Sequence, residues 1–305
     1  MEIVTLMSTY NGERFIREQI DSILAQEGCE VTLVVRDDGS SDGTCTILQE
    51  YMDRGLLRWY TGQNLGPAKS FMDLVMQAPE ADYYAFADQD DIWDADKLAT
   101  GMECLRDCLG PACYGANSRL VDSNGVSMNI LTDRRAKGVV RPLKCLLAAL
   151  FHGGITGCSM VMNRALIAAV QRCGAPDKMI MHDLFIQQIC LSLGGVMLFD
   201  GRPHMSYRQH GKNTVGIQST IWQKIRGRIW AIVEKKPVTV DEVAAEILRL
   251  YEGELPDAHI PVLKRVANYR RNIFTRLSMA CSPKLRDLYL VPGLCLRLSL
   301  LWGNT

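Results

Sequence analysis

The segment FADQDDIWD (residues 86–94) continues an apolar run, YYA, into a cluster of acidic residues. Within seven positions stand four carboxylates, those of Asp88, Asp90, Asp91 and Asp94. Like charges this close raise one another's pKa, so the cluster is costly unless positive charge lies beside it. Because hard cations take oxygen ligands, a divalent cation is the simplest partner. The segment therefore predicts a buried strand that ends at a cation site.

Apolar strands alternate with amphipathic helices on the N-terminal side of this cluster. Strands are predicted at residues 3–8, 31–35, 56–60 and 83–87. Helices are predicted at residues 12–26, 43–53 and 64–78. Alternation of this kind indicates the α/β class, with a Rossmann-like, mostly parallel central sheet, flanking helices and right-handed crossovers.

Three polar loops each follow one of these strands. They are STYNGE (8–13), RDDGSSDG (36–43) and DQDD (88–91). Ligands of open α/β sheets bind beyond the carboxyl ends of the strands, so the three loops are expected to form one site. The motifs GxGxxG and GxxxxGK[ST] are absent, which argues against a dinucleotide-binding fingerprint and a P-loop.

Composition and charge are those of an ordinary globular protein. The 305 residues are 48% hydrophobic and 22% charged, and Lys+Arg and Asp+Glu both total 34, so nothing demands a nucleic acid partner. The 11 cysteines and a start without signal-peptide regions predict reduced thiols in the cytoplasm. No uncharged apolar run approaches the ~18 residues that span a bilayer.

The sequence pattern changes after about residue 215. The alternation of strands and helices already loosens past residue 110, and from about residue 217 onward everything is predicted to be helical. We therefore expect an α/β domain at residues 1–215 and a helical region at residues 216–305. The segment 221–236 mixes apolar residues and tryptophans with Lys and Arg, which is typical of helices in a membrane interface. Packing on the first domain, or on a second subunit in a homodimer, is the alternative.

Seven pieces of this sequence, taken in order, resemble the family 2 glycosyltransferases, which have the GT-A fold and use nucleotide-activated sugars. The pieces span about residues 1–215 and are MSTYNGERFIREQIDSILAQ, VVRDDGSSDGT, NLGPAKSF, FADQDDIWDADKL, ITGCSMVMNR, MHD and YRQHGKNTVG. The versions ADQDDIW and YRQHGKN are most similar to the rhamnosyltransferase-like branch, which builds bacterial surface polysaccharides. The processive-synthase motif QxxRW is absent, which favours the addition of single sugars.

The resemblance implies a nucleotide-binding role for the loops after the first, second and fourth strands. The first loop is expected to contact base and ribose through Thr9, Tyr10, Asn11 and Glu13. Asp38 corresponds to a contact with the pyrimidine ring, which favours uridine or thymidine donors, and Asp88 is expected to face the ribose. Two alternatives stay open: Asn11 caps the next helix, and Asp37 is a turn or capping residue.

The resemblance also implies a metal and a diphosphate at the acidic cluster. Asp90, the second acid of the DxD element, is expected to bind Mg²⁺ or Mn²⁺. An EF-hand loop would need glycine at the sixth position from Asp88, where this sequence has tryptophan. Arg208 and His210 alternate on a predicted strand and share a face. His210 is a candidate metal ligand and Arg208 a candidate diphosphate contact, with an ordinary surface strand as the alternative.

The pair His182-Asp183 stands at the start of an apolar helix. The resemblance implies that Asp183 is the general base that takes the proton of the acceptor hydroxyl in an inverting transfer. His182 is expected to orient Asp183 or to contact the acceptor. Gly157 is expected to shape the acceptor pocket, because glycine permits close backbone approach. A simple helix cap is the alternative for the pair.

These expectations together describe an inverting glycosyltransferase. Its donor would be a pyrimidine nucleotide-diphosphate sugar, a dTDP- or UDP-sugar, with dTDP-rhamnose one candidate, and its acceptor a saccharide or lipid-linked hydroxyl. Related enzymes act on lipid-linked acceptors at the inner face of the plasma membrane, so peripheral contact there is expected. The alternatives are a non-catalytic sugar-nucleotide-binding protein on the same fold and a metal-dependent nucleotide-sugar pyrophosphatase.

Overall fold

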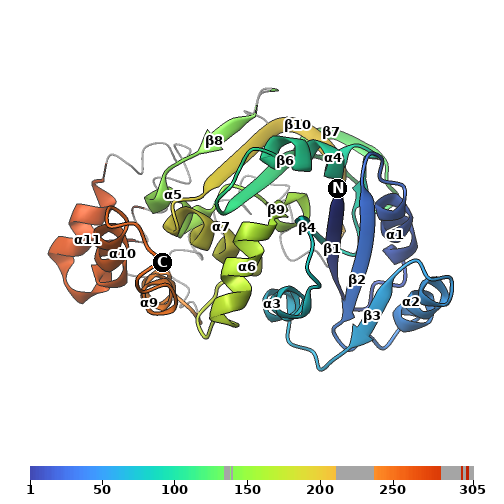
Figure 1. Ribbon diagram of the computed structural model, residues 1–305, viewed down its shortest axis with the longest axis horizontal. Coiled ribbons are helices and arrows are strands. Elements are labelled where there is room, and N and C mark those ends of the chain that lie inside the picture. The colour runs from blue at the N-terminus through green and yellow to red at the C-terminus, as the bar shows by residue number, and fades with distance from the viewer. Residues whose placement is uncertain (134–137, 139, 211–236, 283–296, 298–299, 302–305) are drawn as a thin grey trace.

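A mixed β-sheet runs through the centre of the structure, a computed structural model that describes residues 1–133, 138, 140–210, 237–282, 297 and 300–301 (Figure 1). Its strands in this part of the chain are β1 Glu2–Thr9, β2 Glu30–Asp37, β3 Arg58–Thr61, β4 Tyr83–Ala87, β5 Ile92–Trp93, β6 Ala112–Val121, β7 Ser127–Leu131, β8 Arg141–Leu143, β9 Val161–Asn163 and β10 Val196–Arg208. They join in the order β3-β2-β1-β4-β9-β6-β10-β5, with β7 beside β6 and β8 beside β10.

The first four strands are parallel, and their registers bring their carboxyl ends to one edge. Thr9 at the end of β1 lies opposite Asp37 at the end of β2, and Met7 lies opposite Ala87 at the end of β4. Strands β6 and β10 are also parallel, whereas β5 and β9 pair antiparallel with their neighbours. The predicted α/β class with a mostly parallel sheet is confirmed, and the three polar loops meet at one edge.

Helices cover both faces of this sheet (Figure 1). They are α1 Ile16–Leu24, α2 Thr44–Asp53, α3 Pro67–Gln77, α4 Lys97–Leu105, α5 Leu146–His152, α6 Arg164–Cys173, α7 His182–Ser192, α9 Val240–Leu250, α10 Ile260–Ala267 and α11 Ile273–Ala280, with short 3-10 helices η1 Gly157–Ser159 and η2 Tyr269–Arg271. Helices α1, α2 and α4 share a core cluster with Ile3 and Met7 of β1, and α3, α5, α6 and α7 share another with Val4 and Leu6. Because successive strand residues point to opposite faces, the two clusters lie on opposite sides of the sheet.

The C-terminal helices α9, α10 and α11 pack on the α/β part. Figure 1 shows them gathered at one end of the molecule, beside α5. Val243 and Ile247 of α9 join the same core cluster as Phe151 of α5 and Phe185 of α7. The predicted C-terminal helices are therefore present and share a core with the preceding residues, whereas the division at residue 215 stays a prediction. The helix predicted at residues 221–236 lies outside the described residues.

Within the described residues, no helix has both the length and the hydropathy that a membrane span requires.

Two helices differ from the sequence predictions: α1 begins later than predicted, and α6 was not predicted. The helix predicted at residues 12–26 begins at Ile16, because the residues before it form a turn in which the Phe15 N–H donates to the Gly12 carbonyl at 2.9 Å. Helix α6 has no counterpart among the predicted elements. Its N-cap is Asn163, the last residue of β9, whose side chain accepts a hydrogen bond from the third backbone N–H of the helix at 3.1 Å.

Candidate functional site

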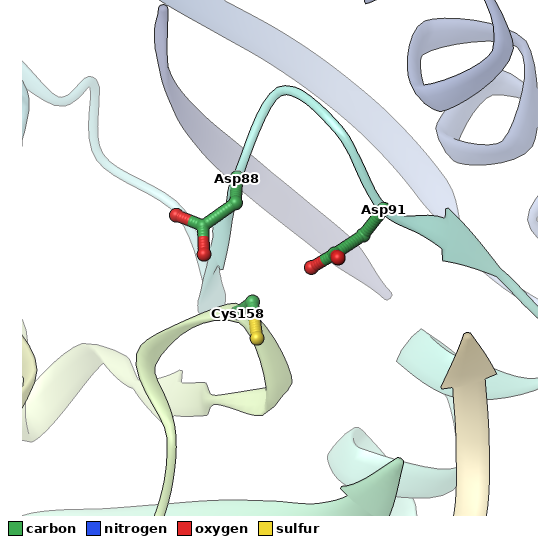
Figure 2. A group of neighbouring side chains, drawn as sticks. All are labelled: Asp88, Asp91 and Cys158. Carbon is green, nitrogen blue, oxygen red and sulfur yellow. The ribbon is translucent and has the colours of Figure 1, made fainter. Parts of the chain in front are cut away.

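Three acids of the cluster, Asp88, Asp90 and Asp91, lie in the loop between β4 and β5, which we call the acidic loop and which is close to the η1 turn (Figure 2). Side-chain oxygens of Asp88 and Asp91 and the sulfur of Cys158 lie within 4.8 Å of one another. Asp91 has no exposed surface, and burial together with the charges of Asp88 and Asp90 raises its pKa well above its usual value. Burial raises the pKa of Asp88 to about 7, and the charges of Asp90 and Asp183 add to this shift. The mutual repulsion expected from the sequence is therefore present.

A buried lysine lies near this cluster. Lys97, the first residue of α4, is 1% exposed, and its Nζ lies 3.3 Å from the centre of the Trp93 ring. Burial lowers its pKa to about 7, although the charges of Cys158, Asp91 and Asp88 favour the ammonium form. The sequence analysis missed Lys97, because lysines are mostly exposed in proteins.

Two groups of side chains in the loop are candidates for holding a metal ion. In the Asp88, Asp91 and Cys158 group, burial raises the pKa of Asp91 well above its usual value, so this carboxyl tends to keep its proton. Burial also raises the pKa of the Cys158 thiol well above its usual value, and a thiol is a poor ligand for a hard cation. The second group, formed by Asp90 and His210, fits such a cation better.

Asp90 and His210 are 120 residues apart in sequence and in contact in the structure. His210 Nε2 lies 2.5 Å from Asp90 Oδ2, and the two side chains are only 14% and 13% exposed. The imidazole ring of His210 stacks on the ring of Phe15, in the turn before α1, with centroids 4.9 Å apart. A carboxylate oxygen and an imidazole nitrogen held together suit Mn²⁺. The structure thus brings the two predicted ligands together, and their metal binding stays a prediction.

Arg208 holds the acidic loop from the end of β10. Its buried guanidinium pairs with Glu18 of α1 at 2.5 Å, donates to the Asp90 carbonyl at 2.8 Å and lies over the Phe15 ring. Its backbone N–H donates to Asp91 Oδ1 at 3.2 Å. These contacts orient the loop from within the protein. The predicted contact of Arg208 with the diphosphate is not among them and stays a prediction.

Gln89, which the sequence analysis passed over, ties the acidic loop to the loop after β1. Its side-chain oxygen accepts hydrogen bonds from Thr9 Oγ1 at 2.7 Å and from the Tyr10 N–H at 2.9 Å. Its amide nitrogen donates to the Tyr10 carbonyl at 3.1 Å. A Cβ on Gly12 would come within 2.2 Å of the Gln89 oxygen, so a larger residue there would displace the Gln89 side chain from these hydrogen bonds. The glycine of STYNGE was the available signal for this close approach.

Asn11 and Glu13 join the loop after β1 to the loop after β2. Asn11 adopts a left-handed φ of 50°, and its side-chain oxygen accepts from the Ser41 N–H at 2.8 Å. Glu13 Oε2 accepts from the Gly43 N–H, at the start of α2, at 2.9 Å. Asn11 therefore does not cap α1, which begins at Ile16 without a side-chain cap bond. The predicted nucleotide contacts of Thr9, Tyr10, Asn11 and Glu13 stay predictions, and Tyr10 and Glu13 are the exposed members of this set.

The two aspartates after β2 have different surroundings. Asp37 accepts hydrogen bonds from the N–H groups of Gly39 and Ser40 at 3.1 and 2.9 Å. Asp37 is therefore a turn residue, one of the alternatives that the sequence left open. Asp38 is buried, pairs with the Arg36 guanidinium and accepts from the backbone N–H groups of residues 65 and 66, both at 2.9 Å. Its carboxylate is fixed at the edge of the sheet, and its contact with a pyrimidine stays a prediction.

The pair His182-Asp183 forms the N-terminus of α7. Asp183 Oδ2 accepts from the Gly157 N–H at 2.9 Å, and Oδ1 accepts from the Leu184 N–H at 2.7 Å. A Cβ on Gly157 would lie 3.0 Å from His182 Nε2 and 3.1 Å from the Asp183 Cβ, so glycine permits this approach, whereas its role in an acceptor pocket stays a prediction. His182 is buried and stacks on Phe71 with centroids 4.0 Å apart, and burial lowers its pKa to about 4. The imidazole is therefore neutral near pH 7.

The start of α7 lies close enough to the acidic loop for the charge of Asp183 to act on Asp88. The charges of both Asp90 and Asp183 contribute to the raised pKa of Asp88. Residues more than 90 positions apart thus form one acidic site at the carboxyl edge of the sheet, with a carboxylate-imidazole pair on one side and a backbone-held carboxylate on the other.

The part of the chain that forms most of this sheet matches a known protein family. Residues 5–166, more than half of the 305-residue chain, match the model of glycosyl transferase family 2. The chain therefore belongs to glycosyl transferase family 2, as the sequence motifs predicted.

Similarity to individual family members extends beyond the matched model. The chain is 27% identical over 221 residues to the dTDP-rhamnosyl transferase RfbG of Shigella flexneri, a match that covers 69% of this chain and 73% of RfbG. It is 30% identical over 105 residues to the putative teichuronic acid biosynthesis glycosyltransferase TuaG of Bacillus subtilis, covering 34% of this chain and 41% of TuaG.

Solved structures share the fold at lower sequence identity. Residues 1–349 of S. aureus TarS superpose with a TM-score of 0.58 at 18% identity, covering 94% of this chain and 77% of that one. TarS 1–349 in complex with UDP gives a TM-score of 0.56 at 17% identity, covering 100% and 89%. The predicted GT-A fold is confirmed by these likenesses.

Proposed function

We propose that this protein is an inverting glycosyltransferase that moves one sugar from a pyrimidine nucleoside-diphosphate donor to a hydroxyl of a saccharide or lipid-linked acceptor. The observation that carries the proposal is that the η1 turn contacts both the acidic loop and the start of α7: Cys158 Sγ lies within 4.8 Å of an Asp88 oxygen, and the Gly157 N–H donates to Asp183 Oδ2 at 2.9 Å. We further propose that it acts in the cytoplasm, in bacterial surface polysaccharide synthesis. The names of RfbG and TuaG, which concern rhamnosyl transfer and teichuronic acid, support this setting.

Asp183 is the proposed general base. Two backbone N–H groups, of Gly157 and Leu184, each bind one of its oxygens and fix the plane of the carboxylate. In the reaction it takes the proton of the acceptor hydroxyl while the hydroxyl oxygen attacks the anomeric carbon, and the nucleoside diphosphate leaves from the opposite face with the bonding electrons. The neutral His182 beside it can offer a hydrogen bond to the acceptor without adding positive charge near the base.

The donor is proposed to lie along the carboxyl edge of the sheet. Residues assigned to the nucleotide are Thr9, Tyr10, Asn11, Glu13, Asp38 and Asp88, which belong to the three joined loops. Asp90 and His210 would hold Mg²⁺ or Mn²⁺, which when bound neutralises charge on the leaving diphosphate. Arg208 keeps Asp90 in place through its bond to the Asp90 carbonyl.

The decisive experiment is a donor panel. The purified chain is incubated with dTDP- and UDP-sugars, Mn²⁺ or Mg²⁺ and saccharide acceptors, and the products are identified by mass spectrometry. dTDP-rhamnose is tested first because RfbG is a dTDP-rhamnosyl transferase by name. Release of nucleoside diphosphate that depends on the acceptor is the expected result. Release of nucleoside monophosphate and sugar phosphate would identify a pyrophosphatase, and binding without any turnover would identify a non-catalytic protein.

A further inference from the structure

Helix α11 turns three large apolar side chains toward solvent. Ile273, Phe274 and Leu277 are 52%, 79% and 43% exposed, and together they form what we call the α11 face. Met279 and Ala280, at the end of the helix, are buried in the core. Single exposed apolar residues are ordinary, whereas several on one side of one helix mark a binding surface.

Positive charge surrounds the α11 face. Residues 258–282 contain five Lys and Arg residues and no Asp or Glu. Arg265 of α10 donates to the Ser278 carbonyl at 3.0 Å, which places its guanidinium against α11. Within the described part of the chain, Lys264, Arg265 and Arg271 form no ion pair. Arg265, which contacts α11, and Arg271, two residues before Ile273, thus place positive charge without an ion-pair partner among the described residues beside the apolar face.

We infer that the α11 face docks this protein onto the surface of an anionic membrane. A helix with apolar residues on one side and cations around them binds at the level of the lipid headgroups, where apolar burial and charge attraction both contribute. Helix α11 is eight residues long, so it lies on the membrane and does not cross it. It also stands at the outer end of the molecule, where a flat surface can reach it (Figure 1).

The charge distinguishes this partner from a second copy of the chain. A symmetric dimer through the α11 face would bring the same cations against one another, and like charges at short range repel. A lipid surface with negative headgroups supplies the opposite charge. The inference concerns attachment and does not depend on the proposed sugar transfer.

Co-sedimentation with vesicles tests the inference with the full-length protein. Vesicles of phosphatidylcholine mixed with phosphatidylglycerol are compared with vesicles of phosphatidylcholine alone, at low and high salt. The protein should pellet with the anionic vesicles at low salt. Arg271→Glu changes two units of charge at the edge of the α11 face, and at about five-fold per charge it should weaken binding at least ten-fold. Phe274→Glu should weaken it by about ten-fold or more, because a charge replaces the most exposed apolar side chain of the face.

Leu109→Glu is the matched control, because Leu109 is 96% exposed and lies in the loop between α4 and β6. It should bind vesicles like the wild type. Melting curves check that all variants are folded. If Phe274→Glu does not fold, the vesicle binding of Arg271→Glu decides the test. The inference is overturned if the wild type stays in the supernatant, if both variants bind like the wild type, or if the control loses as much. A dimer in sedimentation velocity that Phe274→Glu dissolves, without vesicle binding, would identify a subunit interface instead.

Discussion

Replacing Asp183 by asparagine separates the chemistry of the site from its packing. The change removes the negative charge and one acceptor while keeping the shape of the side chain. In the wild type the two carboxylate oxygens accept from the Gly157 and Leu184 N–H groups at 2.9 and 2.7 Å. An amide has a single acceptor oxygen, so one of these two N–H groups must face an NH₂ group.

The size of both effects follows from these contacts. The variant loses an acceptor for the N–H of Gly157 or Leu184, and it loses a negative charge at the start of α7. Together these losses lower the free energy of unfolding by ~1–2 kcal/mol. That lowers the melting temperature by about 2–6 °C. Loss of the general base lowers kcat far more, by about 10²–10⁴. Donor binding should change little, because Asp183 is proposed to touch the acceptor.

The assay measures acceptor-dependent release of nucleoside diphosphate well below the melting temperature, with calorimetry of the donor nucleotide alongside. Glu242→Gln is the matched control, because Glu242 is also an acid in the first turn of a helix and accepts from the Thr239 N–H at 2.9 Å. It should lose stability and keep kcat. If Asp183→Asn turns over within about ten-fold of the wild type, the base is another residue and Asp183 is a helix cap.

Three further variants test other parts of the site. Asp90→Asn should remove most of the dependence of UDP or dTDP binding on Mn²⁺ in calorimetry, whereas the exposed Asp107→Asn should keep it, and equal affinity of the wild type in EDTA would refute the metal role. Gly157→Ala places a Cβ 3.1 Å from the Asp183 Cβ and should lower kcat by about ten-fold without changing the Kd of the donor, whereas an unchanged kcat would mean that the site absorbs the shift. Folding lowers the pKa of His182 from 6.5 to about 4, so the unfolded chain binds the proton more readily and stability is lost as the pH falls through this window. His182→Leu should remove up to about 3 kcal/mol of that loss, measured as denaturant midpoints at pH 7 and pH 4.5, and parallel curves would contradict the buried neutral imidazole.

The fold could be predicted because its signals are local. Each parallel strand is a short apolar run, and each polar loop follows it directly, so the carboxyl edge of the sheet is visible in sequence order. The pairing of Asp90 with His210 was also predictable, although not from spacing: 120 residues separate them, and the family motifs supplied the link.

The residues that support the site were harder to predict for a physical reason. Gln89 and Lys97 look like ordinary polar surface residues, and only the folded chain shows the first bonded to the loop after β1 and the second buried against Trp93. Arg208 was predicted to contact the diphosphate because its charge was visible, whereas its partner Glu18 lies 190 residues away. Charge can be read from a sequence, but the burial of a charge depends on tertiary contacts between residues that are distant in the sequence.

Several buried polar groups near the proposed site have no hydrogen-bond partner among the described residues. Among the described residues, Asp91 Oδ2, Lys97 Nζ and both ring nitrogens of His182 are buried without a hydrogen-bond partner. Each such group costs about 1–3 kcal/mol, and native proteins keep few of them. Asp91 and Lys97 stand beside the acidic loop, and His182 stands beside the proposed base. Groups without a partner also occur away from these residues, for example at Thr5 and Ser192, so an unpaired group supports a role in binding or catalysis only together with its position beside the acidic loop or the proposed base.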